Sequence, residues 1–397
     1  MKREELFFLS LLRDALCEEK KTVVPADLDW DALYALADAQ SLLGLCYSQL
    51  KTLAGSGAAI PEDALQRFHE GLFGDVYLAV NQGRAMDRVF DAFSREGIPL
   101  LPFKGWRVRE AWPEACLRTM GDVDLLIHPE DRERADALML SLGYEKYVDN
   151  HAVWTYFARD ILIEIHDHMF YEHLVSDVDY QAYFDAAWSH VGREDEESFH
   201  LLYLFAHTAK HVINKGMGVR AFLDLCVMCR SARLQGDLLE RELKRLKLFG
   251  FAGVCLAICK RWFALEPPFP IPELPEERLE ALTEKIFRDG TFGLDNEEND
   301  QAKAAKEIQR SGLPYWLAAG KLLRERLFPT YSDMILSSQY AFLKGRPWLL
   351  PVAWVYRWGF ALVHKRELGT SKMTEPLVNR KEIRERQELL RSWNLIE

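Results

Sequence analysis

The chain of 397 residues has no apolar run long enough to span a membrane. Its most aromatic stretch, residues 348–360, is shorter than the roughly 20 residues of a spanning helix, and Pro351 and Arg357 interrupt it. We expect a core helix there rather than a membrane contact. Residues 1–16 begin with basic and apolar side chains, but acidic residues interrupt the run, which favours a helix over a signal peptide. A cytoplasmic protein is expected.

Positive charge is scarce in most of the chain. The net charge is −11, and residues 1–300 hold 33 lysines and arginines against 52 aspartates and glutamates. Only residues 301–397 are basic, with 17 against 9. Because an acidic body repels a polyanion, a general nucleic-acid-binding function is not expected. No internal repeat or low-complexity segment is present either.

Cysteine is also too sparse to suggest a disulfide framework, since the chain has seven. In the cytoplasm these thiols would be reduced. The spacings Cys226-x-x-Cys229 and Cys255-x-x-x-Cys259 are compatible with a zinc site. Both pairs lie in strongly apolar stretches with a helical pattern, however, so the favoured interpretation is that they are thiols of the core.

Two aspartates in the stretch 121–127 carry the strongest functional signal. Asp122 and Asp124 alternate with apolar residues at the period of a β-strand, so both carboxylates project from one face while the other face enters a core. Neighbouring carboxylates repel each other unless a cation lies between them. Divalent metals take oxygen ligands of this kind, often together with substrate phosphates. The pair predicts a site for Mg²⁺ or Mn²⁺, although surface strands also carry such pairs by chance.

A strand-to-helix turn precedes the aspartates. Residues 97–105 read as a short buried strand that ends at Gly105, and a helix is expected to follow it through Glu110 to Trp112. A glycine at such a turn lets a phosphate approach the backbone, where the helix offers unpaired N–H groups. Lys104 can add a point charge. The alternative is an ordinary surface turn with a solvated lysine.

A lone acid follows in the next predicted strands. Residues 129–142 form a helical pattern closed by Gly143, and residues 152–158 and 161–166 have the pattern of a hairpin. Glu164 is the one acid in the second, otherwise apolar strand. Burying it unpaired would be costly, so it should face a cation, a base or a cleft. It could complete a metal site with the aspartates, or it could pair with an arginine such as Arg118.

The flanking regions read as helical. In residues 1–96 apolar side chains recur at helical spacing, and one long helix is predicted from Pro61 to Glu96. His207 and His211 lie four residues apart on one face of a later helix. They could bind a metal, but there is no His-Glu-x-x-His arrangement. A polar support for the site, with Lys210, Arg220 and Asp224 nearby, is therefore favoured.

These motifs together resemble a known family. They are Phe103-Lys104-Gly105, Trp112-Pro113, Arg118, Gly121 to Ile127, Leu142-Gly143-Tyr144, Ile163 to His166, the His207/His211 helix and Asp224. Their order and spacing resemble the uncharacterised bacterial nucleotidyltransferase-like family within the DNA polymerase beta-type nucleotidyltransferase superfamily. The resemblance implies an α+β fold with a nucleotidyltransferase-type mixed sheet core, flanked by helical N-terminal and C-terminal domains.

The resemblance also implies roles for individual residues. Asp122 and Asp124 would be the metal pair and Glu164 the third acid, and these three would be catalytic. The other assigned residues are Lys104, Gly105 and Arg118, which would bind nucleotide, and His166, His207, His211 and Asp224, which would support the site. The chain departs from the wider superfamily in having Lys104-Gly105 where Gly-Gly or Gly-Ser is usual, with a longer gap before the aspartates.

The sequence leads to four predicted regions and one predicted activity. The regions are a helical N-terminal domain (1–96), an α/β core (97–190), a helical domain (191–295) and a basic, aromatic helical segment (296–397). The predicted activity is metal-dependent transfer of an NMP group from an NTP, with ATP as the expected donor, to a hydroxyl-type acceptor. The acceptor, a small molecule or a protein, is not identified. The alternative is a non-catalytic nucleotide-binding or regulatory module that keeps the fold.

Overall fold

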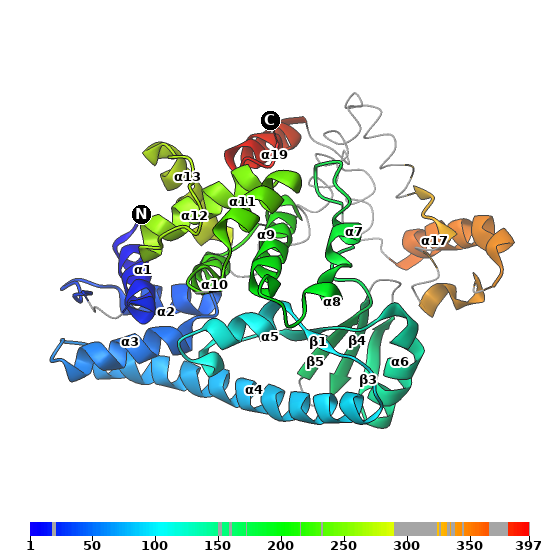
Figure 1. The fold of residues 1–397 in the computed structure, drawn as a ribbon, viewed down its shortest axis with the longest axis horizontal. Coiled ribbons are helices and arrows are strands. Elements are labelled where there is room, and N and C mark those ends of the chain that lie inside the picture. Colours follow the sequence, from blue (N-terminus) through cyan, green and yellow to red (C-terminus); the bar gives the residue numbers. More distant parts are fainter. Residues whose placement is uncertain are drawn as a thin grey trace. The chain divides into compact units, whose positions relative to one another are not determined.

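The computed structural model describes residues 1–17, 21–149, 153–158, 161–171, 173–214, 216–231, 233–289, 324, 327–331, 334, 338–343, 345–364 and 380–396. The chain divides into two compact units (Figure 1). The first comprises residues 1–174, 178–294 and 392–395. The second comprises residues 175–177, 295–391 and 396–397.

Four helices open the first unit. They are α1 (Arg3–Leu16), α2 (Trp30–Ala39), α3 (Leu43–Gly55) and α4 (Glu62–Arg95). The predicted long helix is confirmed: Pro61 is the N-cap of α4, and Gly97, with φ +63°, follows its end. Residues at helical spacing on one face of α4 are buried, among them Ala85, Met86, Val89 and Phe93. In Figure 1, α4 runs from beside α3 to the sheet.

A five-stranded mixed sheet follows. Its strands are β1 (Leu101–Pro102), β2 (Asp122–Leu126), β3 (Glu145–Asp149), β4 (Val153–Ala158) and β5 (Ile161–His166). The spatial order is β1-β2-β5-β4-β3, in which only the β2/β5 pair is parallel. The predicted β4/β5 hairpin is confirmed. The strand β3 was not predicted from the sequence, because its polar residues lack the alternation that identified the other strands.

One face of this sheet is a hydrophobic core. The odd-numbered apolar residues of β2 and β5 pack there against α4 and against α6 (Arg132–Ser141), with the short 3₁₀ turn η3 (Pro129–Asp131) leading into α6. Ile163 and Ile165 from β5 and Val123 and Leu125 from β2 are all buried. The period of two then forces the even-numbered residues of both strands onto the opposite face. That opposite face carries the predicted acids. An α+β fold with a mixed sheet core is therefore confirmed.

Short and long helices complete the first unit. Between β1 and β2 lie α5 (Lys104–Val108), η1 (Arg109–Ala111) and η2 (Ala115–Leu117), and after β5 come α7 (Tyr180–Phe184), α8 (Ala187–His190), α9 (Glu196–Asn214), α10 (Val219–Cys229), α11 (Gly236–Arg245), α12 (Phe249–Phe263) and α13 (Glu276–Asp289). Cys226, Cys229, Cys255 and Cys259 are buried free thiols of α10 and α12, which confirms the core interpretation. Among the described residues, no cysteine belongs to a group that could hold a metal.

The regular elements described in the second unit are helices and 3₁₀ turns. They include η4 (Ser338–Leu343), η5 (Pro347–Leu349), α17 (Leu350–His364) and most of α19 (Arg380–Ser392), whose last residue belongs to the first unit. The expected core helix in residues 348–360 is only partly right. Ala353 is buried in a cluster with Leu343, but Val352 and Val355 are exposed. Of the described helices, none is both long and apolar enough to cross a membrane.

Candidate functional site

The parallel pairing of β2 with β5 positions the central acids. Asp124 and Glu164 are register partners on these adjacent strands, and Leu126 pairs with His166 two residues further along. The Nε2 atom of His166 lies 2.9 Å from Asp124 Oδ1 and 3.5 Å from Glu164 Oε2. Ligand atoms of these three residues all lie within 4.8 Å of one another. The structure thus brings together two of the three predicted acids with His166, and Asp122 is not a member of that group.

Lys104 contacts this cluster through Asp124. Its Nζ atom is 2.5 Å from Asp124 Oδ1, and both side chains are largely buried, at 17% and 5% exposure. Lys104 is also the first residue of α5 and has φ +48°, a left-handed conformation that costs a non-glycine residue about 1 kcal/mol or more. The alternative of an ordinary surface turn with a solvated lysine is therefore wrong. The helix predicted to run from Gly105 to Trp112 is also corrected, because α5 ends at Val108 and continues only as a 3₁₀ turn.

Gly105 is explained by close packing. A Cβ atom at this position would lie 2.7 Å from Nη1 of Arg118 and 3.0 Å from Sδ of Met120. Any side chain would therefore push against the Arg118 guanidinium. Glycine is therefore needed here because the turn packs closely against Arg118. This reason differs from the approach of a phosphate, for which Gly105 was singled out in the sequence.

Arg118 is held by Asp224 of α10. Arg118 donates from Nε and Nη2 to the two carboxylate oxygens of Asp224, at 2.9 and 2.7 Å. Trp112 Nε1 donates to the same carboxylate at 2.8 Å. The alternative in which Arg118 pairs with Glu164 is therefore wrong, because the bidentate carboxylate partner of Arg118 is Asp224. These bonds connect the segment before β2 to α10.

Helices α9 and α10 form the far wall of a cavity of about 390 Å³. Asp122, Asp124, Lys104 and Gly105 line one side, and His207, His211 and Asp224 are among the residues on the other. The two histidine Nε2 atoms are 2.9 Å apart, so one ring donates a hydrogen bond to the other. A volume in this range is typical of small-molecule sites. Every predicted site residue except Glu164 and His166 lines this cavity.

Charge within the cluster is unevenly distributed. Burial, and then the negative charges of Asp124 and Glu164, raise the pKa of Asp122 to about 6. Burial alone would also raise the pKa of Asp124, but the Lys104 ammonium and the hydrogen bond from His166 outweigh it and lower that pKa to about 2. Asp124 is therefore a firmly ionised carboxylate, and Asp122 is the acid whose charge is least compensated.

The wall of the cavity formed by α9 and α10 contains an uncharged histidine, His207. Burial, followed by the neighbouring His211, lowers the pKa of His207 well below its ordinary value. Burial would likewise lower the pKa of Lys104, but the Asp124 carboxylate outweighs it and raises this pKa above its ordinary value. At neutral pH Lys104 is thus the cation nearest the acids, and His207 carries no charge.

The cluster has the donor set of a divalent metal site. The carboxylate oxygens of Asp124 and Glu164 suit Mg²⁺ or Mn²⁺, and the His166 imidazole holds the Asp124 carboxylate by a hydrogen bond. The position of the Lys104 ammonium shows that a cation is accommodated at Asp124. His166 Nδ1 is buried and has no hydrogen-bond partner among the described residues, so the ring is held by its Nε2 contact with Asp124 and by packing against Phe103. The residues present therefore fit a divalent cation.

Two residues that were not assigned to the site from the sequence, Gln82 and Tyr203, also contact it, as does Arg220, which was expected nearby. Gln82 of α4 is buried and donates to the Met120 carbonyl at 2.9 Å, and Arg220 donates to Oγ1 of Thr119 at 3.1 Å. Tyr203 of α9 is buried beside Lys104 and packs against Phe103. Gln82 stands three residues after Ala79 and three before Ala85 on the buried face of α4, so a polar residue in an apolar stripe was an available signal.

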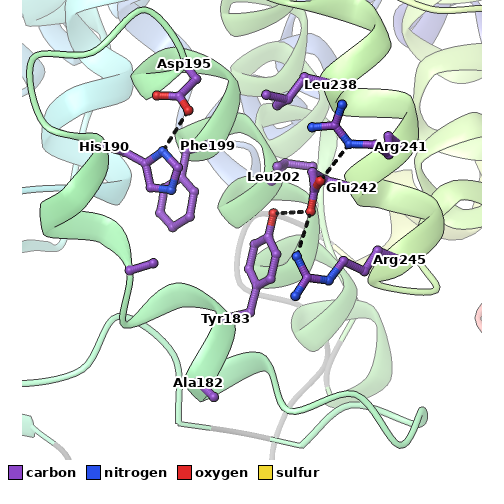
Figure 2. Close-up of a pocket in the computed structure, with 11 residues that line it drawn as sticks. Ala182, Tyr183, His190, Asp195, Phe199, Leu202, Leu238, Arg241, Glu242 and Arg245 are labelled. Carbon is purple, nitrogen blue, oxygen red and sulfur yellow. Dashed lines mark hydrogen bonds and ion pairs between the residues drawn. The ribbon is translucent and has the colours of Figure 1, made fainter.

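A second cavity of about 340 Å³ lies between α7 and α8 on one side and α9 and α11 on the other (Figure 2). Tyr183, Arg241 and Arg245 surround Glu242 there, and His190 pairs with Asp195 across from them. The predicted site residues, all of which the structure describes, lie elsewhere.

Comparison with known proteins agrees with this geometry. The model of a family described as uncharacterised nucleotidyltransferase matches residues 26–264, which is more than half of the chain. The protein belongs to this family of nucleotidyltransferases. The matched range includes the whole sheet, the acid cluster and the α9–α10 wall. No curated protein and no solved structure matches the chain.

Proposed function

We propose that this protein transfers an NMP group from an NTP, with ATP as the expected donor, to a hydroxyl-type acceptor and releases pyrophosphate. One observation carries the proposal: Asp124 and Glu164 are register partners on parallel strands, and Asp124 lines, together with Asp122, a cavity that also contains Lys104 and Arg118. Aligned acids beside basic side chains suit a metal-bound triphosphate.

In this proposal the three acids bind the metal together, and Glu164 has a second role. Asp122, Asp124 and Glu164 would hold Mg²⁺ or Mn²⁺, which, when bound, stabilises the attacking and leaving oxygens. Glu164, at the edge of the cluster and 24% exposed, would accept the proton of the acceptor hydroxyl. His166 donates from Nε2 to Asp124, so it would position that carboxylate rather than remove the proton itself.

Basic residues would bind the triphosphate. Lys104 supplies a buried ammonium, and Arg118 is positioned by its bidentate contact with Asp224. The Lys104–Asp124 ion pair also supports the second candidate, a non-catalytic nucleotide-binding module. In such a module the pair would be a permanent cross-link between α5 and β2. In an enzyme it must open, and the two candidates therefore differ in a measurable way.

Transfer of label tests the activity directly. The protein would be incubated with labelled ATP, GTP, CTP or UTP, Mg²⁺ or Mn²⁺, and a cell extract as the source of acceptor. We expect a labelled product with one nucleotide and none with the variant that combines Asp122→Asn and Asp124→Asn. Labelling that persists in this variant would show that the acids are not catalytic.

Thermal melting tests the site without an acceptor. Mg²⁺ or Mn²⁺ with ATP should raise the Tm of the parent protein, because a ligand that binds the folded state stabilises it by mass action. The double aspartate variant should melt cooperatively but show no such rise. An exposed-residue control, Asp27→Asn, should behave like the parent. An unchanged rise in the double variant would contradict the proposed metal site.

A further inference from the structure

We propose that Lys104 is an internal cation that occupies the metal site until a nucleotide arrives, so that metal uptake depends on the nucleotide. This inference rests on the proposed function, since it concerns how the same site is loaded. The observation behind it is that one oxygen of Asp124 contacts both the Lys104 ammonium, at 2.5 Å, and His166 Nε2, at 2.9 Å.

The charge of Asp124 is already neutralised in this arrangement. Its side chain is 5% exposed and that of Lys104 is 17% exposed, so water screens the ion pair only weakly. A divalent cation approaching the same carboxylate would meet a buried ammonium a few ångströms away, and their repulsion is twice that between two single charges. The metal alone should therefore bind weakly.

A triphosphate removes this obstacle. Lys104 and Asp124 both line the cavity of about 390 Å³, so the ammonium can turn to a phosphate oxygen without leaving the site. Its long side chain has rotatable bonds and three donors, which suits an exchange of partners. Once Lys104 contacts phosphate, Asp124 becomes available to the metal. Two ligands that each favour the same rearranged state bind with positive coupling.

Lys104 differs from Lys210, the other lysine that lines this cavity. Lys210 also lines the cavity, but it lies on α9, and the acid cluster is on the sheet. The direct contact with a predicted metal ligand belongs to Lys104. Lys210→Met is therefore a matched control: it removes the same charge from the same cavity without freeing Asp124.

Binding of each ligand alone tests the inference. Mn²⁺ would be titrated into the full chain without nucleotide, with electron paramagnetic resonance as the readout of free ion. ATP would be titrated separately in EDTA by calorimetry. Lys104→Met should bind Mn²⁺ at least tenfold more tightly than the parent and ATP at least tenfold more weakly. Lys104→Arg, which keeps the charge, should bind Mn²⁺ as weakly as the parent, and Lys210→Met should not gain Mn²⁺ affinity.

The location of the gained metal is checked with a second substitution. Adding Asp124→Asn to Lys104→Met should abolish the tighter Mn²⁺ binding, and a cooperative melt of each variant verifies folding. If the parent binds Mn²⁺ alone as tightly as Lys104→Met, the internal-cation inference is wrong, whether or not the protein transfers nucleotides. If the affinity changes occur but no label is transferred, the inference stands and the catalytic proposal fails.

Discussion

The two cavities of the first unit are similar in volume, about 390 and 340 Å³, but their charges are arranged differently. In the cavity beside the sheet, Arg118 pairs with Asp224, 106 residues away, and their side chains are 9% and 15% exposed. In the cavity of Figure 2, Glu242 pairs with Arg241 and Arg245 of its own helix, and these arginine side chains are 66% and 71% exposed.

This difference shows why volume alone does not identify a site. Exposed pairs between neighbours on one helix contribute about 0–1 kcal/mol and are mainly solvated surface. Buried pairs lose hydration on both sides, and that loss can exceed the Coulomb gain. Lys104–Asp124 and Arg118–Asp224 are therefore costly arrangements for stability alone, which is consistent with a functional role.

The largest expected effect is on turnover. Glu164→Gln removes a metal ligand and the proposed base, so the rate of nucleotidyl transfer should fall by about 10²–10⁴-fold, the range typical of general-base catalysis. ATP affinity should change far less. Steady-state kinetics with the identified donor measures both. Glu242→Gln makes the same chemical change in the other cavity and should leave the rate unaltered. Equal losses in the two variants would remove the distinction between the cavities.

Breaking the buried pair should have the next largest effect. Arg118→Met leaves the Asp224 carboxylate largely buried without its bidentate partner, although Trp112 still donates to it, so the free energy of unfolding should fall by about 3–5 kcal/mol. Urea denaturation gives the value. Combining Arg118→Met with Asp224→Leu should recover part of the loss, because no uncompensated charge is then buried. This would be contradicted if the double variant lost more free energy of unfolding than the two single variants lose in sum.

A pH effect of smaller size is expected from His200 of α9. Burial, and then the positive charges of Arg107 and Arg118, lower the pKa of its imidazole to about 3. Both ring nitrogens are buried, and neither has a hydrogen-bond partner among the described residues. The unfolded chain binds a proton near pH 6.5 and the folded chain does not, so stability is present above that pH and falls as the pH drops toward 3.

The difference between the parent and a His200→Phe variant at pH 7 and pH 5.5 isolates this residue. His200 should account for about 1 kcal/mol of the parent's loss of stability over that interval, since one differential proton corresponds to about 1.4 kcal/mol per pH unit. His200→Phe should lose correspondingly less when both proteins are unfolded with urea at each pH. Parallel losses in parent and variant would mean that His200 binds its proton normally in the folded state.

The smallest effect belongs to the cavity of Figure 2. Arg245→Gln removes an ion pair whose arginine is 71% exposed, so the free energy of unfolding should change by no more than about 1 kcal/mol. Salt should weaken even this contribution, because exposed charges are screened. Denaturation at low and high ionic strength checks it. A loss as large as that of Arg118→Met would show that exposure does not explain the difference between the cavities.

Much of the local structure could be predicted from residue patterns. The helical spacing in residues 61–96, the alternation in residues 122–126 and the hairpin of residues 153–166 all correspond to elements of the structure. These elements have strong periods that bury one face, so sequence alone specifies them. β3 escaped prediction, because its residues do not alternate and its strand pairing is supplied by β4.

The site, too, could be predicted only in part from the sequence. The strand period alone determines that Asp122 and Asp124 share a face, because successive side chains of a strand point to opposite sides. It does not determine which strand lies alongside, and the parallel register that sets Glu164 next to Asp124 comes from the packed sheet. Tertiary structure likewise decided that Lys104 contacts Asp124, and Arg118 contacts Asp224. Those pairings join residues 20 and 106 positions apart, and no local period reaches across such distances.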